Sequence, residues 1–166
     1  DIGAGLTKIA MISEAGKGEQ GTVSGERMLK VAGAARDMIN RLNVIVWALN
    51  PRYDNLDNLI SYTRRYFGEY LEKFGISFRM EVPDIIPDLA VTPDFRRNAF
   101  YAWQEAIHNA VKHSTCSEIK FEMKIKDQTM LVNISDNGKG FDRAKPGSGG
   151  NGLLNMKKRA EEMGGT

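Results

Sequence analysis

The most regular feature of this sequence is an apolar stripe along one long predicted helix. The stripe consists of Met28, Val31, Ala35, Met38, Leu42, Ile45 and Leu49. Their 3-4-3-4-3-4 spacing is the a/d pattern of a heptad repeat, which places all of them on one helix face. A helix with such a stripe needs a partner to bury it. We therefore expect a dimeric four-helix bundle; an internal helix packed on its own domain is the alternative.

The flanking sequence completes a helical hairpin. Residues 1–15 carry a shorter helical pattern, and the segment from Ala15 to Gly25 holds four glycines, which predicts a loop. Asn50-Pro51 ends the long helix because proline disfavours helix in the residue before it.

The rest of the chain mixes helical and strand patterns. Helices are predicted at 53–74, about 93–113 and 151–163, and strands at 76–82, 119–125 and 130–134. Asp54 or Asn55 is the expected cap of the first helix, whose apolar face is predicted to extend to Phe74, and Leu154 is expected to face inward in the last. This order predicts an α+β fold, an α/β sandwich with helices on one face of a mixed sheet.

Composition excludes several classes of protein. The 166 residues carry a formal charge of +2 with 27% charged residues, so we expect neither a nucleic acid nor a membrane surface as partner. The single cysteine, Cys116, allows no internal disulfide, and two histidines provide no Cys/His metal set. No apolar run is long enough to span a membrane.

Two stretches combine side chains suited to nucleotide chemistry. Glu105, Asn109 and Lys112 recur at i, i+4 and i+7, so they share one face of a predicted helix. Asp136 follows a predicted strand and begins a turn with two glycines at 138 and 140. An aspartate can accept a hydrogen bond from the amino group of adenine, and an amide oxygen is a hard ligand for Mg²⁺. A plain turn and a solvated glutamate are the alternatives.

Three segments resemble known boxes of an ATPase superfamily that includes gyrase, MutL and the sensor histidine kinases. The segment 104–114 resembles its N-box, 136–141 its G1 box, and 150–156 with Arg159 its G2 region. The Glu-x-x-x-Asn-x-x-Lys-His form at 105–113 is similar to the nitrate- and membrane-fluidity-sensor histidine kinases. Residues 2–7 also resemble the segment that follows their phosphoacceptor histidine.

The resemblance implies two domains and a set of partners. Residues 1–52 would form a dimerisation and histidine-phosphotransfer hairpin, and 53–166 a catalytic domain that binds ATP and Mg²⁺. The stripe would join a homodimer, and the phosphoryl group would pass from a histidine to a response regulator. The core would be cytoplasmic, with a membrane anchor in an upstream region of the parent protein.

The resemblance also implies roles for single residues. Asn109 would hold Mg²⁺, Glu105 would be an acidic group near the line of attack, and Lys112 and His113 would contact phosphates. Asp136 would bind adenine. The other residues of the implied ATP site are Gly138, Gly140, Phe141, Gly150, Asn151, Gly152 and Leu153, with a lid at 143–150 hinged at Gly150 and Gly152.

Three departures from the family pattern limit these expectations. The phosphoacceptor histidine would lie two residues before Asp1, so this chain is not expected to phosphorylate itself there. Ala4 replaces a glutamine that many members use in dephosphorylation, and the family's last strands would follow Gly165. Two other functions stay open: a related ATPase or serine kinase of the anti-sigma-factor type, and a non-catalytic dimerisation scaffold.

Overall fold

The computed structural model describes residues 7, 9, 11, 25–126, 129–140 and 152–166. The chain divides into two compact units, 1–50 and 51–166. In the first unit Thr7, Ile9 and Met11 are helical. The rest of the predicted helix over 1–15, the loop after it and the predicted lid lie outside the described residues.

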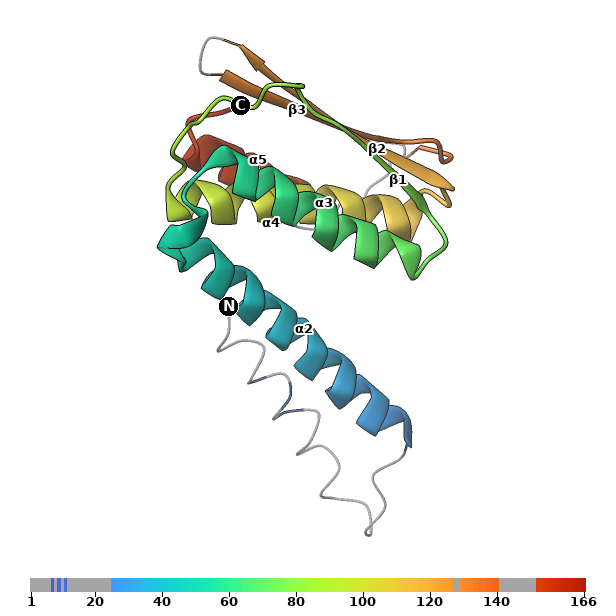
Figure 1. Cartoon of the computed structure of the whole chain (residues 1–166). Coiled ribbons are helices and arrows are strands. Elements are labelled where there is room, and N and C mark those ends of the chain that lie inside the picture. Colours follow the sequence, from blue (N-terminus) through green and yellow to red (C-terminus); the bar gives the residue numbers. More distant parts are fainter. Residues whose placement is uncertain (1–6, 8, 10, 12–24, 127–128, 141–151) are drawn as a thin grey trace. The chain divides into compact units, whose positions relative to one another are not determined.

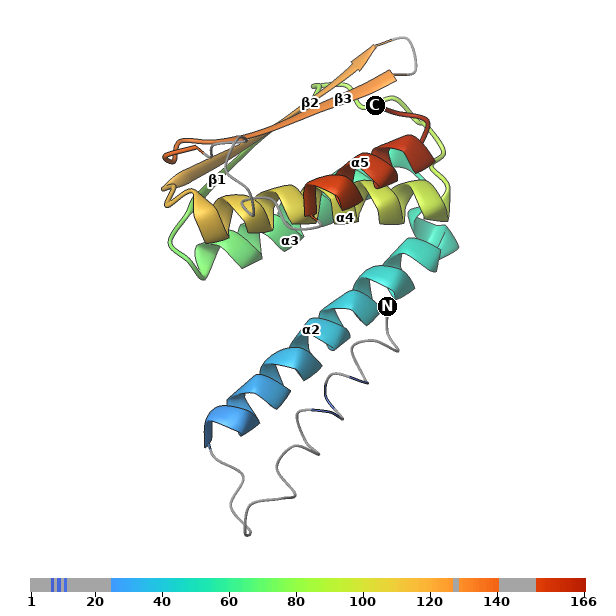
Figure 2. The same cartoon turned by 180° about the vertical axis from the view of Figure 1, so that it is seen from behind.

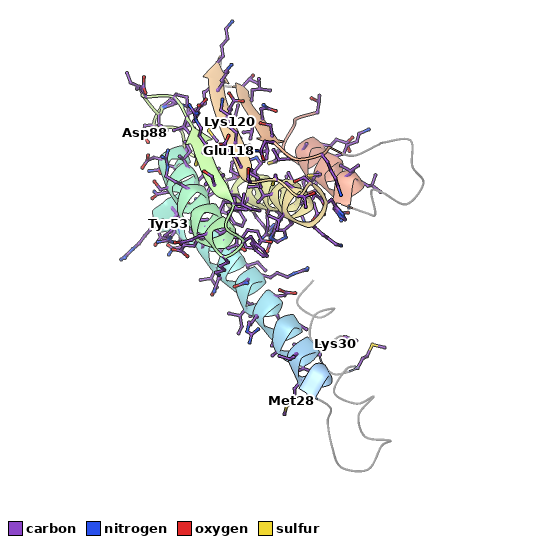
Figure 3. The ribbon with its side chains drawn as sticks, turned by 90° about the vertical axis from the view of Figure 1, so that its right-hand side faces the viewer. Met28, Lys30, Tyr53, Asp88, Glu118 and Lys120 are labelled. Atoms are coloured by element: carbon purple, nitrogen blue, oxygen red, sulfur yellow. The ribbon has the colours of Figure 1, made fainter. Side chains whose placement is uncertain are left out.

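Helix α2 (Gly25–Leu49) carries the predicted heptad stripe, and its members differ in exposure. Met38 is only 8% exposed, whereas Met28, which is labelled in Figure 3, is 65% exposed. Two members of the predicted stripe, Leu42 and Leu49, are exposed together with Ile39 and Val46, which the prediction did not include. This set has the spacing 3-4-3, so the accessible apolar surface of α2 is itself a heptad stripe.

The second unit begins with a short 3₁₀ turn, Pro51–Tyr53, and helix α3 (Leu56–Glu72). Asn55 is the N-cap, because its side chain accepts a hydrogen bond from the Asn58 N–H at 2.9 Å. The helix ends at Glu72, and Gly75 follows with a φ of +67°. Phe74 therefore lies beyond the helix and is 53% exposed, so its predicted place on the buried face is wrong.

Helix α4 (Pro93–His113) begins as the sequence predicts, with Thr92 accepting a hydrogen bond from the Phe95 N–H and proline at the first position. Arg96, in its first turn, is fully buried and pairs with Asp54 at 2.6 Å. That pairing explains why Asp54 is not the cap of α3.

The sheet has the order β1 (Ser77–Glu81), β2 (Glu118–Lys126) and β3 (Thr129–Asp136). β1 runs parallel to β2, and β3 is antiparallel to it. Helices α3, α4 and α5 all lie on one side of this sheet (Figures 1 and 2). The helix-facing side chains of β2 are buried at Ile119, Phe121 and Met123. The predicted α+β fold with a mixed sheet covered on one face is confirmed.

The other face of the sheet carries charged side chains. Lys120, labelled in Figure 3, pairs with Glu81 at 3.0 Å and with Glu122 at 2.9 Å. Asn133 donates to Glu122 at 3.1 Å. The hydrogen bond with Glu122 raises the pKa of Lys120, and the same bond lowers the pKa of Glu122. Along β2, buried apolar residues thus alternate with charged residues on the other face, which is the period-2 pattern of a sheet with one buried face.

Helix α5 (Gly152–Glu162) packs along α4. The buried Asn98 accepts from Arg159 at 2.9 Å and donates to Glu162 at 3.1 Å. The Arg159 guanidinium also lies 4.9 Å from the centre of the Tyr101 ring. Leu154 is 67% exposed, so the prediction that it faces inward is wrong. No helix in the described part of the chain is long and apolar enough to cross a membrane.

Candidate functional site

The second half of α4 places a row of polar side chains at the surface of the domain. Glu105 and Asn109 are half-buried, and Lys112 and His113 are exposed in the last turn. The opposite side of the same half is anchored in the core by Trp103, Ile107 and Ala110. None of the four polar side chains makes a hydrogen bond or ion pair with another described residue. Among the described residues, their hydrogen-bonding groups therefore have no partner.

Strand β3 delivers Asp136 to the helix side of the sheet. Asp136 pairs with the buried Ile119 and has the same parity along β3 as Ile134, which pairs with the buried Phe121. One oxygen of its carboxylate, Oδ1, accepts from the Gly138 N–H at 2.9 Å. Within the described part of the chain, the other oxygen accepts no hydrogen bond, so it can receive one from a ligand.

The turn after Asp136 lies directly against the end of α4. A Cβ at Gly138 would overlap the backbone oxygen of Ser114 and lie 2.6 Å from its Cβ. The Lys139 N–H donates to that same Ser114 oxygen at 3.0 Å. Only glycine at 138 allows this approach, and a φ of +68° favours glycine at 140. Ser114 thus joins the turn after Asp136, the residue predicted to bind adenine, to the end of α4, the helix predicted to contact phosphates.

The start of α5 approaches the same helix face. A Cβ at Gly152 would overlap the Oε1 atom of Glu105 and lie 3.4 Å from the Nδ2 atom of Asn109. A larger residue at 152 would therefore displace the flexible end of the Glu105 side chain. The structure therefore brings Glu105, Asn109 and Gly152 together, although 43 residues separate the last two in sequence.

The remaining predicted site residues divide into two groups. Leu153 is exposed beside Gly152 at the start of α5. Phe141, Gly150 and Asn151 lie outside the described residues, as does the predicted lid. The histidine without a predicted site role, His108, packs with its ring 4.8 Å from that of Tyr70.

Sequence reasoning missed two polar residues that shape this site. Ser114 is buried; its Oγ donates to the Ala110 carbonyl at 2.7 Å and accepts from the Cys116 N–H at 3.2 Å. Asn137 accepts hydrogen bonds from the backbone at the start of β2. The available signal was the preference of serine and asparagine for capping and turn positions, which does not reveal their partners.

Comparison with known proteins gives a family match within the second unit. Residues 96–166 match the family described as Histidine kinase-, DNA gyrase B-, and HSP90-like ATPase. This part of the chain is therefore similar to the ATPase domains of that family. The match begins near the start of α4 and includes every part of the site described above, so the resemblance of the three boxes is confirmed.

The curated relatives of this chain are named as sensor proteins and sensor histidine kinases. Sensor protein VraS of Staphylococcus aureus (strain COL) is 35% identical over 60% of this chain and 30% of its own length. Sensor histidine kinase LiaS of Bacillus subtilis (strain 168) is 32% identical over 58% of this chain and 27% of its own length. The matched region thus spans under a third of these relatives.

Solved structures confirm the fold. The chain aligns with the Acinetobacter baumannii histidine kinase AdeS at a TM-score of 0.60 and 12% identity, covering 95% of this chain and 83% of that one. It aligns with the histidine kinase domain of a blue-light activated kinase from Erythrobacter litoralis at a TM-score of 0.54 and 14% identity, covering 97% and 85%. At these identities, the likeness concerns the fold.

Proposed function

We propose that this chain is the core of a two-component sensor histidine kinase that binds ATP with Mg²⁺. The observation that carries the proposal is the convergence of Glu105, Asn109 and Gly152 with the turn at Asp136, in a domain of the matching ATPase family. The alternative readings as a serine kinase or a scaffold gain no support from a specific feature of the site.

The residues present fit a magnesium nucleotide. Gly138 lets the turn after Asp136 approach Ser114 closely, and Gly152 lies beside Glu105 and Asn109. Glycines at such positions leave the backbone accessible to phosphate and ribose groups. The Asn109 amide would supply an oxygen to Mg²⁺, and the available oxygen of Asp136 would accept the adenine amino group. When bound, Mg²⁺ neutralises phosphate charge and fixes the phosphate chain for transfer.

The other side chains of the site would position the phosphates and balance their negative charge. Lys112 and His113 extend from the last turn of α4, where they would donate to phosphate oxygens. Glu105 would supply an acidic group at the point where the phosphoryl acceptor enters. Backbone N–H groups at the start of α5, from Asn151 to Leu153, would add donors at a helix N-terminus.

The first unit would carry the partner histidine and the dimer interface. We propose that residues 1–52 belong to a dimerisation and phosphotransfer hairpin and that 53–166 form the catalytic domain. The homodimer would use the heptad surface of α2, with the exposed stripe from Ile39 to Leu49 supplying much of the contact. A response regulator would then accept the phosphoryl group on an aspartate, in the cytoplasm, with the parent protein anchored in a membrane.

Calorimetric titration with a non-hydrolysable ATP analogue and Mg²⁺ tests the nucleotide site. We expect the chain to bind this analogue and to ignore the GTP analogue, with Asp136→Asn weakening ATP binding at least about tenfold. Asp88→Asn, an exposed loop carboxylate outside the site, is the matched control and should bind normally. Equal affinity for both nucleotides, or no binding at all, would refute the proposal.

Sedimentation tests the dimer. The chain should sediment as a dimer, and Val46→Glu should convert it to a monomer because a charge would enter the shared apolar surface. Ile85→Glu, at an equally exposed apolar position in the second unit, should leave the dimer intact. A monomer at high protein concentration would contradict the proposed interface.

A further inference from the structure

Asn137 ties the turn of the candidate site to the neighbouring strand. Its Oδ1 atom accepts from the Ser117 N–H at 2.9 Å and from the Glu118 N–H at 3.0 Å. Its Nδ2 group donates to the Ser117 Oγ at 3.0 Å, and its backbone N–H donates to the Glu118 carbonyl at 3.3 Å. One asparagine therefore makes four hydrogen bonds to two adjacent residues at the start of β2.

This attachment sets the position of the residues on either side of Asn137. Asp136 precedes it, and Gly138 follows it with the N–H that holds the Asp136 carboxylate at 2.9 Å. Lys139, next in the chain, is held through its N–H by Ser114 at 3.0 Å. The carboxylate thus has its orientation fixed by a backbone N–H whose own place depends on the Asn137 side chain.

We propose that Asn137 is a positioning residue for adenine recognition, acting through the orientation of the Asp136 carboxylate. The inference deepens the proposed function, since it names what makes the acceptor selective. A carboxylate free to rotate would accept hydrogen bonds in many directions. A carboxylate held by one oxygen presents the other in one direction, which favours a ligand with an amino group at that place.

Asn133 provides a matched comparison. It is the same residue type, four residues earlier and on β3 itself, whereas Asn137 directly follows the strand. The Asn133 side chain is also exposed and bonded to β2, at Glu122. It lies on the outer face of the sheet, away from the turn. If an asparagine on this strand only joined β3 to β2, replacing either residue would have the same effect on nucleotide binding.

Amide hydrogen exchange tests the attachment without any ligand. Asn137→Ala should raise the exchange of the Ser117, Glu118 and Gly138 amides at least about tenfold, because each loses its hydrogen bond or the geometry for it. Asn137→Asp, which keeps the acceptor oxygens, should stay near the unmodified chain, and Asn133→Ala should leave these amides unchanged. Unaltered exchange in Asn137→Ala would overturn the proposal.

Competition between two nucleotides tests the consequence. ATP and purine riboside triphosphate differ only by the 6-amino group, and with Mg²⁺ the unmodified chain should prefer ATP roughly tenfold, the scale of one hydrogen bond to a charged acceptor. Asn137→Ala should reduce this preference below about threefold, with Asn137→Asp restoring it. A merely structural role would weaken both nucleotides equally, and an unchanged ratio would therefore overturn the inference.

The two experiments separate this inference from the proposed function. If the unmodified chain binds neither nucleotide, the proposed function fails, and the role of Asn137 in adenine selection fails with it. The exchange rates then still decide whether Asn137 holds the turn. If the chain binds both nucleotides equally, Asp136 does not recognise adenine and only the selectivity is refuted.

Discussion

The two halves of α4 use polar residues in opposite ways. In the first half, Arg96 and Asn98 are buried and bonded to Asp54, Arg159 and Glu162. In the second half, Glu105 and Asn109 are half-buried and make no hydrogen bond to another described residue. The polar side chains of Arg96 and Asn98 are thus bonded within the fold, whereas those of Glu105 and Asn109 have no partner among the described residues.

The difference separates stability from binding along a single helix. Side chains that hold the fold should cost unfolding free energy when they are replaced, with little effect on ligand affinity once the chain is folded. Side chains that await a ligand should show the reverse. Four experiments test this separation and the contacts beside it, beginning with the largest expected effect.

Arg96→Ala should lower the free energy of unfolding by about 3 kcal/mol, because it removes a fully buried guanidinium and its ion pair with Asp54. Denaturant unfolding measures this loss. Arg97→Ala is the control: Arg97 is next in the chain and pairs with Asp94 at the surface, so its loss should cost under about 0.5 kcal/mol. Equal costs for the two arginines would contradict the assignment of a structural role to the first half.

Asn98→Ala and Asn109→Ala compare the same residue type in the two halves. Asn98→Ala should cost about 1–2 kcal/mol of stability because two hydrogen bonds to α5 are lost. Asn109→Ala should leave stability within about 0.5 kcal/mol and weaken Mg-ATP binding by about tenfold or more. Unfolding and calorimetry on both variants measure the two effects, and the Asn109 loss should shrink when Mg²⁺ is chelated.

Tyr62 packs against Phe100 of the first half at 5.1 Å, and burial, followed by the neighbouring Tyr66, raises the pKa of Tyr62 to about 12. The pKa of Tyr62 in the folded chain lies above its ordinary value of 10.0. The neutral tyrosine therefore contributes to the free energy of unfolding in full below pH 10, and this contribution is lost as the pH rises towards 12. Since the ring is partly exposed, the loss should not exceed about 1 kcal/mol. Tyr62→Phe should remove that alkaline loss in denaturant unfolding at pH 9 and pH 11.

Thr115, just beyond the second half, has a φ of +56°, a conformation that β-branched residues rarely adopt. Thr115→Gly should relieve this strain but increases the entropy of the unfolded chain, so a net gain of about 0.5 kcal/mol is expected. Thermal unfolding measures the gain. Thr129→Gly, in a regular strand, should instead lower stability.

Most of the fold could be predicted because it depends on local patterns. The 3.6 and 2.0 periodicities identified the helices and strands, and the helix predicted at about 93–113 is α4, Pro93–His113. The errors at Phe74 and Leu154 arose at helix ends, where a turn more or less of helix decides which way a side chain points.

The candidate site was harder to predict because its geometry depends on distant residues. The spacing of Glu105 and Asn109 identified a shared helix face, yet no local pattern indicates that Gly152 packs against it. The link from Arg96 to Asp54 joins residues 42 positions apart and likewise has no local signal. The roles of the site residues in binding stay predictions until a nucleotide is titrated.

The glycines at 138 and 140 differ in a way that chemical synthesis can separate. At 140 the requirement concerns handedness: the backbone adopts a φ of +68°, and no heavy atom of the described residues lies near the place of a Cβ. A D-alanine there should therefore be accepted where L-alanine is strained. At 138 the requirement concerns volume, because Ser114 already occupies the space of an L side chain. A semisynthetic domain would thus tolerate a D-residue at 140, whereas an L-residue at 138 is excluded by volume.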